Sequence, residues 1–163
     1  MSTIPVILTI AGSDCSGGAG IQADIKTISA LKGYAASVIT AVTAQNTTGV
    51  QAVYPIPPDI VRAQIISVTD DLQPAAIKIG MVHNAAIVHT IAECLQKYRS
   101  RFVVYDPVMV STSGRKLMTE DTVCAIQNEL FPPLFPDNSQ FERSVFASFQ
   151  PRYGPGGNET RRS

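Results

Sequence analysis

Several residue types that define specialised protein classes are scarce or missing in this chain of 163 residues. It has no tryptophan and only three cysteines, Cys15, Cys94 and Cys124, an odd number scattered along the chain. A disulfide framework needs paired cysteines, so this count argues against a disulfide-stapled fold and favours a reducing compartment. The expected location is therefore cytoplasmic.

The chain also lacks an excess of charge of either sign. Only 16% of the residues are charged, and 13 basic residues balance 13 acidic ones. Binding to nucleic acid or to an anionic membrane surface needs a basic excess or patch, so neither partner is expected. The apolar run at 5–11 is far too short to span a bilayer and has no basic flank. This composition is typical of an ordinary soluble globular protein.

The apolar pattern that is present alternates between strands and helices. Strands are predicted at 4–11, 35–45, 50–56, 75–80 and 102–108, and helices at 21–31, 58–72, 84–95 and 119–130. Alternating elements of this kind predict a parallel sheet in a layered α/β fold. The last strand is almost continuously apolar, which indicates a strand covered by helices on both faces.

Local signals mark the ends of these helices. Pro58 is suited to a first helical position, and Asn84 and Thr119 are suited to capping a helix start. Gly33 lies where a helix C-cap glycine is expected.

The composition changes after residue 131. The segment 132–163 holds five of the eleven prolines and four of the six phenylalanines, and shows no sustained period. We therefore expect a first unit at 1–131, followed by a tail at 132–163 that is either disordered or the product of a shifted reading frame.

A glycine-rich loop, 12–20, joins the first strand to the first helix. Glycine lets the backbone approach a ligand closely, because it has no Cβ and tolerates positive φ. A helix start also presents free N–H groups. The loop thus predicts a small-molecule site above the end of the first strand.

Three interpretations of this loop compete. A Walker phosphate-binding loop is excluded, because no Gly-Lys-Ser/Thr follows the glycines. The stretch 18–23 fits the dinucleotide pattern G-x-G-x-x-A, but the acidic residue expected about 20 residues later is missing, and Gln45 lies in that region. The third interpretation is that the glycines only turn the chain.

The ends of the other predicted strands carry few charges. They bring Gln45, Asn46, Met81 and Asp106 to the edge where ligands of parallel α/β sheets bind. Such a set suits an uncharged flat ligand held by a few polar contacts.

Four ordered motifs carry a family resemblance. The stretch AGSDCSGGAGIQAD at 11–24 resembles the signature of hydroxymethylpyrimidine/phosphomethylpyrimidine kinases, and TAQNT at 43–47, KIGM at 78–81 and DPVM at 106–109 match further blocks of that family. The resemblance implies the N-terminal portion of a ribokinase-like, three-layer α/β/α fold, apparently C-terminally truncated. It also implies ATP-dependent phosphorylation of 4-amino-5-hydroxymethyl-2-methylpyrimidine and its monophosphate in thiamine biosynthesis. ATP and Mg²⁺ are the implied cofactors, and a homodimer is the implied assembly.

Carried over by position, the resemblance assigns a pyrimidine pocket to a set of five residues: Gly12, Asp24, Gln45, Met81 and Val108. A carboxylate and an amide can read the edge of an aminopyrimidine, and the apolar members can contact its ring. Asp106 is the implied oxygen ligand for Mg²⁺. Simpler roles stay open: a helix-dipole partner for Asp24, a turn former for Asp106, a backbone partner for Gln45, and core packing for Met81 and Val108.

The chain also departs from the family. Relatives carry an Asn-x-x-Glu motif that helps hold Mg²⁺ and a Gly-x-Gly-Cys loop that stabilises the transferring phosphoryl group, and neither motif occurs in this sequence. We therefore assign no catalytic residue. A pyrimidine kinase is the leading hypothesis; the alternatives are a non-catalytic pyrimidine-binding remnant, a vitamin kinase resembling pyridoxal kinase, and a dinucleotide-binding module.

Overall fold

The computed structural model describes residues 4–100, 102–106 and 118–130. Within these residues the chain forms one five-stranded sheet in the order β3-β2-β1-β4-β5. The strands are β1 (Val6–Asp14), β2 (Tyr34–Asn46), β3 (Gly49–Pro55), β4 (Ala76–Ile79) and β5 (Phe102–Tyr105). The helices are α1 (Gly20–Ala30), α2 (Pro58–Leu72), α3 (Ala85–Tyr98), α4 (Glu120–Ala125) and the π-helical turn η1 (Ile126–Leu130).

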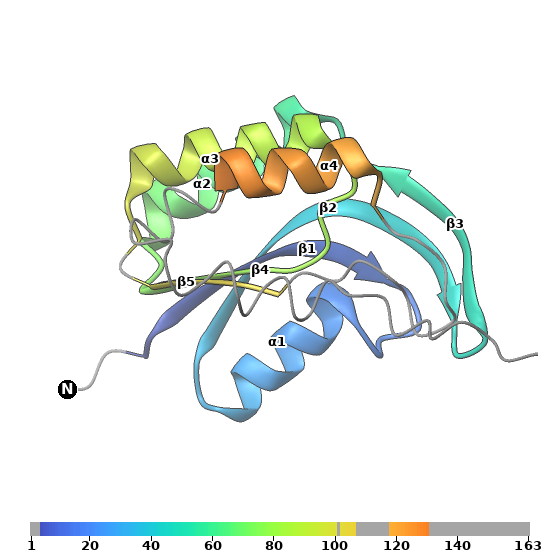
Figure 1. Ribbon diagram of the computed structural model, residues 1–163. Coiled ribbons are helices and arrows are strands. Elements are labelled where there is room, and N and C mark those ends of the chain that lie inside the picture. Colours follow the sequence, from blue (N-terminus) through green and yellow to red (C-terminus); the bar gives the residue numbers. More distant parts are fainter. Residues whose placement is uncertain (1–3, 101, 107–117, 131–163) are drawn as a thin grey trace, which may run out of the picture.

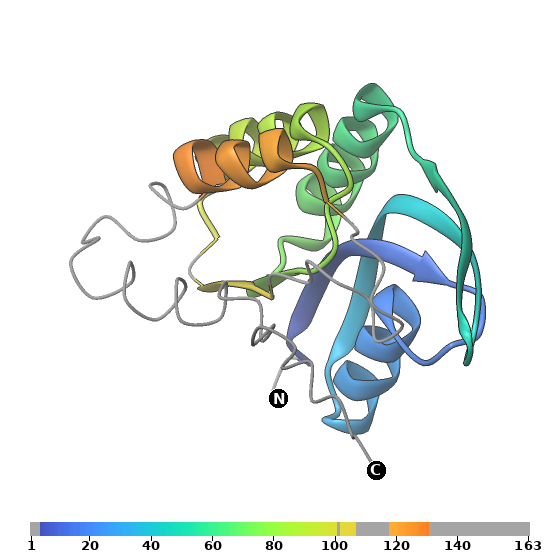
Figure 2. The same ribbon diagram turned by 45° about the vertical axis from the view of Figure 1, so that its right-hand side comes forward.

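Helices cover the sheet on both sides, so the predicted three-layer α/β/α arrangement is confirmed. Figure 1 shows α2, α3 and α4 above the sheet and α1 below it, and the turned view in Figure 2 agrees. The alternation of side chains along a strand explains this division. On β1, Leu8 and Ile10 belong to the core under α2 and α3. Thr9, the residue between them, faces α1 and bonds to Asp24 there.

The main core lies between the sheet and the upper helical layer. Its largest fully buried side chains come from β1, β2, β4, α2, α3 and η1: Leu8, Ile10, Val38, Val61, Ile79, Ile87, Ile91, Ile126 and Leu130. Burial of such a side chain contributes about 1.5–3 kcal/mol. No helix among the described residues is long and apolar enough to cross a membrane.

The sheet is mostly parallel but not entirely so. β1 pairs in parallel with β2 and β4, and β4 with β5, whereas β3 runs antiparallel to β2. The predicted parallel sheet is therefore confirmed for β2, β1, β4 and β5, and β3 is the exception. The connection after Asn46 is too short for a crossover and can only reverse the chain. The Asn46 side chain holds the reversal, because its Oδ1 accepts bonds from the N–H groups of Thr48 and Gly49.

The predicted caps of α2, α3 and α4 are present. Pro58 opens α2, Asn84 Oδ1 accepts the Ile87 N–H, and Thr119 Oγ1 accepts the Thr122 N–H. The end of α1 differs from the prediction, because the left-handed residue is Lys32, with φ 64°, rather than Gly33. Gly33 is required by packing instead: a Cβ there would lie 2.9 Å from Cδ1 of Ile7.

β5 is not covered on both faces as expected. Phe102 and Val104 are 56% and 60% exposed. β5 has a single strand neighbour among the described residues, so it forms an edge of the described sheet. The end of the predicted strand at 107–108 and the predicted tail at 132–163 lie outside the described residues.

Candidate functional site

Parallel pairing places four chain segments at one edge of the sheet. β1 ends at Asp14, β2 at Asn46, β4 runs into Gly80, and β5 runs into Asp106. The glycine-rich loop and the start of α1 follow β1 at this same edge (Figure 1). In sheets of this kind, ligands bind at the carboxyl ends of the strands.

The buried carboxylate of Asp14 organises the glycine-rich loop. Its Oδ1 accepts bonds from the N–H and the hydroxyl of Ser16, at 2.8 and 2.7 Å. Its Oδ2 accepts the N–H groups of Gly18 and Ala19, at 3.0 and 2.8 Å. The loop amides therefore point inward at a side chain of the same loop. These three loop N–H groups are therefore not available to a ligand, whereas the expectation of free N–H groups concerned the helix start that follows them.

Two opposing effects act on the Asp14 carboxyl. Burial raises its pKa, but the hydrogen bonds from Ser16, Ala19 and Gly18 favour the charged form and together outweigh burial, so the pKa lies below its usual value. An ionised Asp14 neutralises the partial charges of the loop amides. An external phosphate would have to displace this carboxylate to use them.

Further bonds tie the loop to α1. Gln22 accepts the Asp14 N–H at 2.9 Å and donates to the Ser13 hydroxyl at 2.8 Å. Lys26 donates to the Gly17 carbonyl at 2.8 Å. These contacts fix the loop before any ligand is bound.

Gly12 and Met81, two of the five residues assigned to a pyrimidine pocket, are neighbours. A Cβ at Gly12 would lie 2.6 Å from Cε of Met81. The Met81 backbone is held by the Thr40 hydroxyl, which donates to its carbonyl at 2.8 Å. The Met81 thioether therefore rests over a part of β1 where only glycine leaves it room.

Gln45 is held from two sides at the end of β2. Its backbone N–H and carbonyl both bond to the thiol of Cys15, at 3.3 and 3.0 Å. The Thr43 hydroxyl shares its single proton between the side-chain Oε1 of Gln45, at 3.2 Å, and the Ser13 carbonyl, at 2.9 Å. These bonds leave the side-chain NH₂ group of Gln45 as the part suited to a ligand acceptor.

Asp24 lies on the α1 face of the sheet and is engaged by two strand residues. Its Oδ2 accepts the Thr9 hydroxyl at 2.6 Å and the Lys78 ammonium at 2.9 Å. The same ammonium lies 3.9 Å from Oδ2 of Asp106. The sequence predicts no role for Thr9 or Lys78. A lysine in the middle of a short apolar strand was the one signal for this arrangement, since a charge there needs a partner.

The described residues supply only part of an Mg²⁺ site. Asp106 carries an exposed carboxylate, but no group of three His, Cys, Asp or Glu side chains that could hold a metal occurs in the described ranges. Mg²⁺ is often bound by one or two carboxylates together with substrate phosphates. Asp106 therefore fits Mg²⁺ as one ligand of an ion that phosphate oxygens also hold. Val108, the remaining residue assigned to the pocket, lies outside the described residues.

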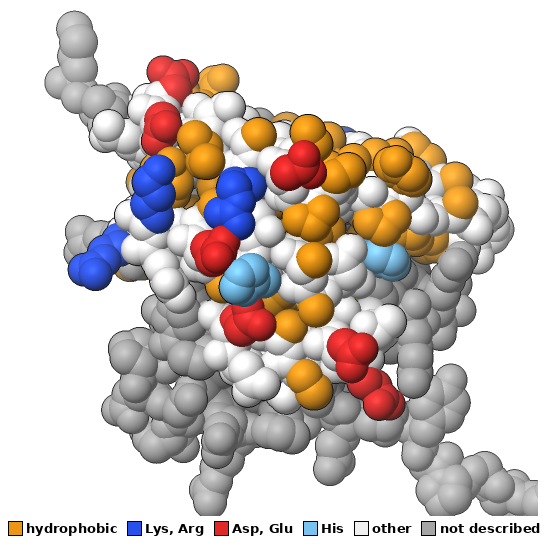
Figure 3. Space-filling model, turned by 90° about the horizontal axis from the view of Figure 1, so that it is seen from above, with side chains coloured by type: hydrophobic (Ala, Val, Ile, Leu, Met, Phe, Trp, Pro, Cys, Tyr) orange, Lys and Arg blue, Asp and Glu red, His pale blue; other side chains and the backbone are white. Residues whose placement is uncertain are grey.

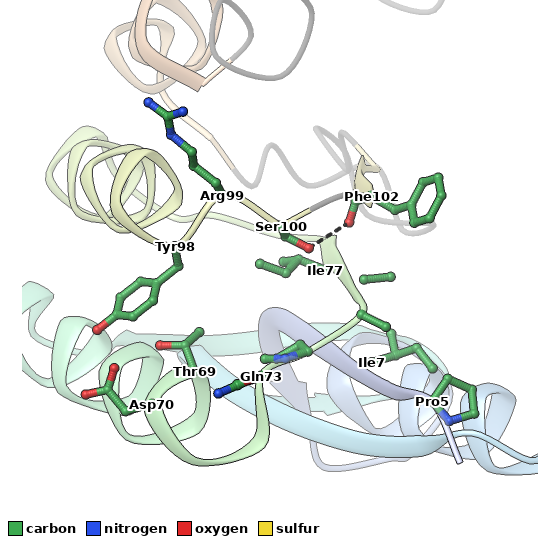
Figure 4. A pocket seen from close by; sticks show the side chains of 13 residues that line it. Pro5, Ile7, Thr69, Asp70, Gln73, Ile77, Tyr98, Arg99, Ser100 and Phe102 are labelled. Atoms are coloured by element: carbon green, nitrogen blue, oxygen red, sulfur yellow. Dashed lines mark hydrogen bonds between the residues drawn. The ribbon is translucent and has the colours of Figure 1, made fainter. Parts of the chain in front are cut away.

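A cavity of about 710 Å³ lies at the opposite edge of the sheet (Figure 4). It is lined by the amino ends of β1, β4 and β5 and by the last turns of α2 and α3, with Asp70, Gln73 and Tyr98 among its polar side chains. None of the residues assigned to substrate, metal or the glycine-rich loop lines it. Size alone does not make it the functional site, because neither the glycine-rich loop nor the carboxyl ends of the strands line it.

Solved structures with the same fold indicate the class of protein to which the chain belongs. Phosphomethylpyrimidine kinase from Clostridium difficile 630 matches with a TM-score of 0.76 and 49% identity, over 80% of this chain and 57% of that one. Pyridoxal kinase from Staphylococcus aureus, solved in complex with AMP-PCP, matches with a TM-score of 0.70 and 32% identity, over 80% of this chain and 47% of that one. The fold is that of the ribokinase-like vitamin kinases.

Sequence comparison narrows the class to one family. The phosphomethylpyrimidine kinase family model matches residues 14–135, and the chain belongs to this family. Hydroxymethylpyrimidine/phosphomethylpyrimidine kinase of Escherichia coli K12 is 53% identical over 77% of this chain, and that of Rhizobium meliloti is 54% identical over 78%. The chain spans 47% of the length of each of these two relatives.

Proposed function

We propose that this chain provides the pyrimidine-binding part of a hydroxymethylpyrimidine/phosphomethylpyrimidine kinase. The reaction is the ATP-dependent phosphorylation of 4-amino-5-hydroxymethyl-2-methylpyrimidine and of its monophosphate, in thiamine biosynthesis. The observation that supports it best is the placement of Gly12 against Met81 beside the loop that Asp14 organises. The three free thiols, Cys15, Cys94 and Cys124, support a cytoplasmic location.

The chemistry of the proposed substrate matches the side chains at this edge. An aminopyrimidine has an exocyclic NH₂ donor and ring-nitrogen acceptors, which suit the carboxylate of Asp24 and the amide of Gln45. Met81 offers a polarisable contact to the ring. ATP supplies the phosphate for the hydroxymethyl oxygen, and Asp106 would hold Mg²⁺ together with the phosphates.

A second candidate is pyrimidine binding without catalysis. Three N–H groups of the glycine-rich loop are taken by Asp14, so the described residues offer no anion hole there for a transferring phosphoryl group. A pyridoxal-kinase-like activity has less support, because the pyridoxal kinase of S. aureus is 32% identical, against 49% for the C. difficile phosphomethylpyrimidine kinase.

One pair of measurements decides among these functions. The purified chain is titrated calorimetrically with the hydroxymethylpyrimidine and with pyridoxal, and ADP formation with Mg·ATP is followed for each. Pyrimidine-dependent ADP formation supports the kinase, and pyrimidine binding without ADP supports the non-catalytic role. A folded protein that binds only pyridoxal, or neither compound, contradicts the proposal.

The partner proposed besides the substrate is a second copy of this chain. Val42 and Tyr54 are 44% and 68% exposed and lie directly opposite each other on β2 and β3. Ala44 and Ala52 are the next pair on the same face, and both are exposed. This apolar strip at a sheet edge supports a homodimer.

A further inference from the structure

Thr9 and Lys78 act on Asp24 as a pair. They are directly opposite each other in the parallel register of β1 and β4, so their side chains stand side by side on the face that α1 covers. Both donate to the same carboxylate oxygen, Oδ2 of Asp24, at 2.6 and 2.9 Å. The sheet thus holds the Asp24 side chain at one oxygen only.

The other oxygen of that carboxylate is left available. Within the ranges that the structure describes, no donor reaches Oδ1 of Asp24. The side chains of Asp24 and Lys78 are 19% and 26% exposed, so the pair is largely shielded from water. Asp24 is held at its backbone by α1 and at Oδ2 by the sheet, so the position of Oδ1 is restricted as well.

The position of the Lys78 ammonium is itself constrained. A Cβ at Gly80 would lie 2.9 Å from Nζ of Lys78, so glycine at that position leaves room for the ammonium. Nζ also lies 3.9 Å from Oδ2 of Asp106. One positive charge therefore links carboxylates from α1 and from the end of β5.

We propose that Lys78 is the positioning residue for recognition of the substrate amino group, because it orients Asp24 so that Oδ1 accepts a hydrogen bond from the exocyclic NH₂ of the pyrimidine. This inference rests on the proposed function. Asp24 is the residue in contact with the ligand, and Lys78 acts through it. Preference for an amino-bearing pyrimidine over one without the amino group is the property that Lys78 sets.

The test compares two ligands by calorimetry: 4-amino-5-hydroxymethyl-2-methylpyrimidine and 5-hydroxymethyl-2-methylpyrimidine, which lacks the amino group. The unaltered chain should prefer the amino compound by about tenfold or more, as for a hydrogen bond to a charged group. Lys78→Met should reduce this preference to within about twofold, with little change in affinity for the second compound, and Lys78→Arg should restore part of it. Lys97→Met removes an exposed lysine on α3 and should leave the preference unchanged.

A second variant keeps the test decisive if Lys78→Met does not fold. Thr9→Val removes the other donor to Oδ2 with little change of shape and should also weaken the preference for the amino compound. Full preference in a folded Lys78→Met protein overturns the role of Lys78. Where Lys78→Met does not fold, full preference in Thr9→Val overturns the orientation of Asp24 through Oδ2, and either result leaves the proposed function standing. Failure of the unaltered chain to bind either pyrimidine overturns both.

Discussion

The backbone of Gly20 lies against that of Gly12, so closely that a Cβ at Gly20 would come within 2.2 Å of the Gly12 carbonyl oxygen. Gly20 is also the first residue of α1 and has φ +57°. The start of α1 therefore reaches the backbone of β1 only because Gly20 lacks a side chain. This contact closes the glycine-rich loop.

Gly20→Ala should therefore destabilise the protein strongly. The left-handed backbone costs about 1–2 kcal/mol for a residue with a Cβ, and the overlap with the Gly12 carbonyl adds to it. We expect urea unfolding to show a loss of more than about 2 kcal/mol. The matched control is Gly18→Ala, where a Cβ would meet Asp14 Oδ2 at an ordinary 3.7 Å. Equal losses in the two variants would contradict this account.

Asp14→Asn should weaken the loop and change its response to acid. An amide cannot accept bonds at both ends, so one of the loop N–H groups would face an NH₂ group. Because the folded-state pKa of Asp14 is lowered, its contribution to stability is present above the usual value near 3.8 and is lost as the pH falls through the folded-state pKa. The difference in unfolding free energy between the two proteins should be full at pH 6 and shrink below pH 4. A constant difference from pH 6 to pH 2.5 would show that ionised Asp14 is not the cause.

Much of the fold could be predicted from hydrophobic periodicity and end signals. The caps at Asn84 and Thr119 are set by local chemistry, and the structure confirms them together with the layers and the approximate strand and helix positions among the described residues. The direction of β3 was missed because periodicity carries no information on pairing. The length of the turn after Asn46 held that information, since it is too short for a crossover.

The candidate site could be predicted less completely. The motifs identified which strand ends carry the site. The role of Asp14 depends on a loop that folds back onto its own side chain, and the role of Lys78 depends on a contact with Asp24, which is far away in the sequence. Thr9 resembles any buried strand threonine until its register with Lys78 is known. The pairing register of β1 and β4, rather than residue type, makes Thr9 and Lys78 partners of the same carboxylate.

His89 should make the upper helical layer sensitive to pH. Its ring bonds to Glu129 at 2.8 Å and to Glu93 at 3.1 Å, and Arg62 also pairs with Glu93 (Figure 3 shows acidic, basic and histidine side chains on this face). The bond to Glu129 and the charge of Glu93 raise the pKa of His89 above its usual 6.5. A raised pKa contributes stability that is complete below about pH 6.5 and is lost as the pH rises through the folded-state pKa.

The measurement is thermal unfolding of the unaltered protein and of His89→Gln from pH 5 to pH 9. The unaltered protein should be the more stable at pH 5, and the difference should vanish at the alkaline end. Glu129→Gln should bring the NMR titration midpoint of His89 back toward 6.5. A midpoint at or below 6.5 in the unaltered protein would contradict the assigned contacts.

Tyr54→Lys should dissociate the proposed homodimer. A lysine opposite Val42 would place a charge in the middle of the exposed apolar strip, where a second copy would have to desolvate it. Light scattering after gel filtration should show a dimer for the unaltered chain and a monomer for the variant. Tyr34→Lys, at the far end of β2 and 56% exposed before substitution, should remain dimeric. A monomeric unaltered chain would rule out the homodimer.

Gly12→Ala should impair ligand binding more than it impairs folding. The new Cβ would lie 2.6 Å from Cε of Met81, the mobile end of a flexible side chain that can turn away. We expect a loss of about 1 kcal/mol in unfolding free energy, as for mild overpacking, and a weakening of pyrimidine affinity by about tenfold, because the displaced thioether no longer meets the ring.

Gly33→Ala provides the opposite pattern. Its Cβ would press on Cδ1 of Ile7 and Cγ2 of Ile28, at 2.9 and 3.0 Å, far from the strand ends that carry the site. This variant should lose stability while its pyrimidine affinity, measured on folded protein, stays within about twofold of the unaltered chain. If Gly12→Ala binds the pyrimidine as well as Gly33→Ala does, Met81 does not contact the ligand, and the pocket must lie elsewhere along this edge.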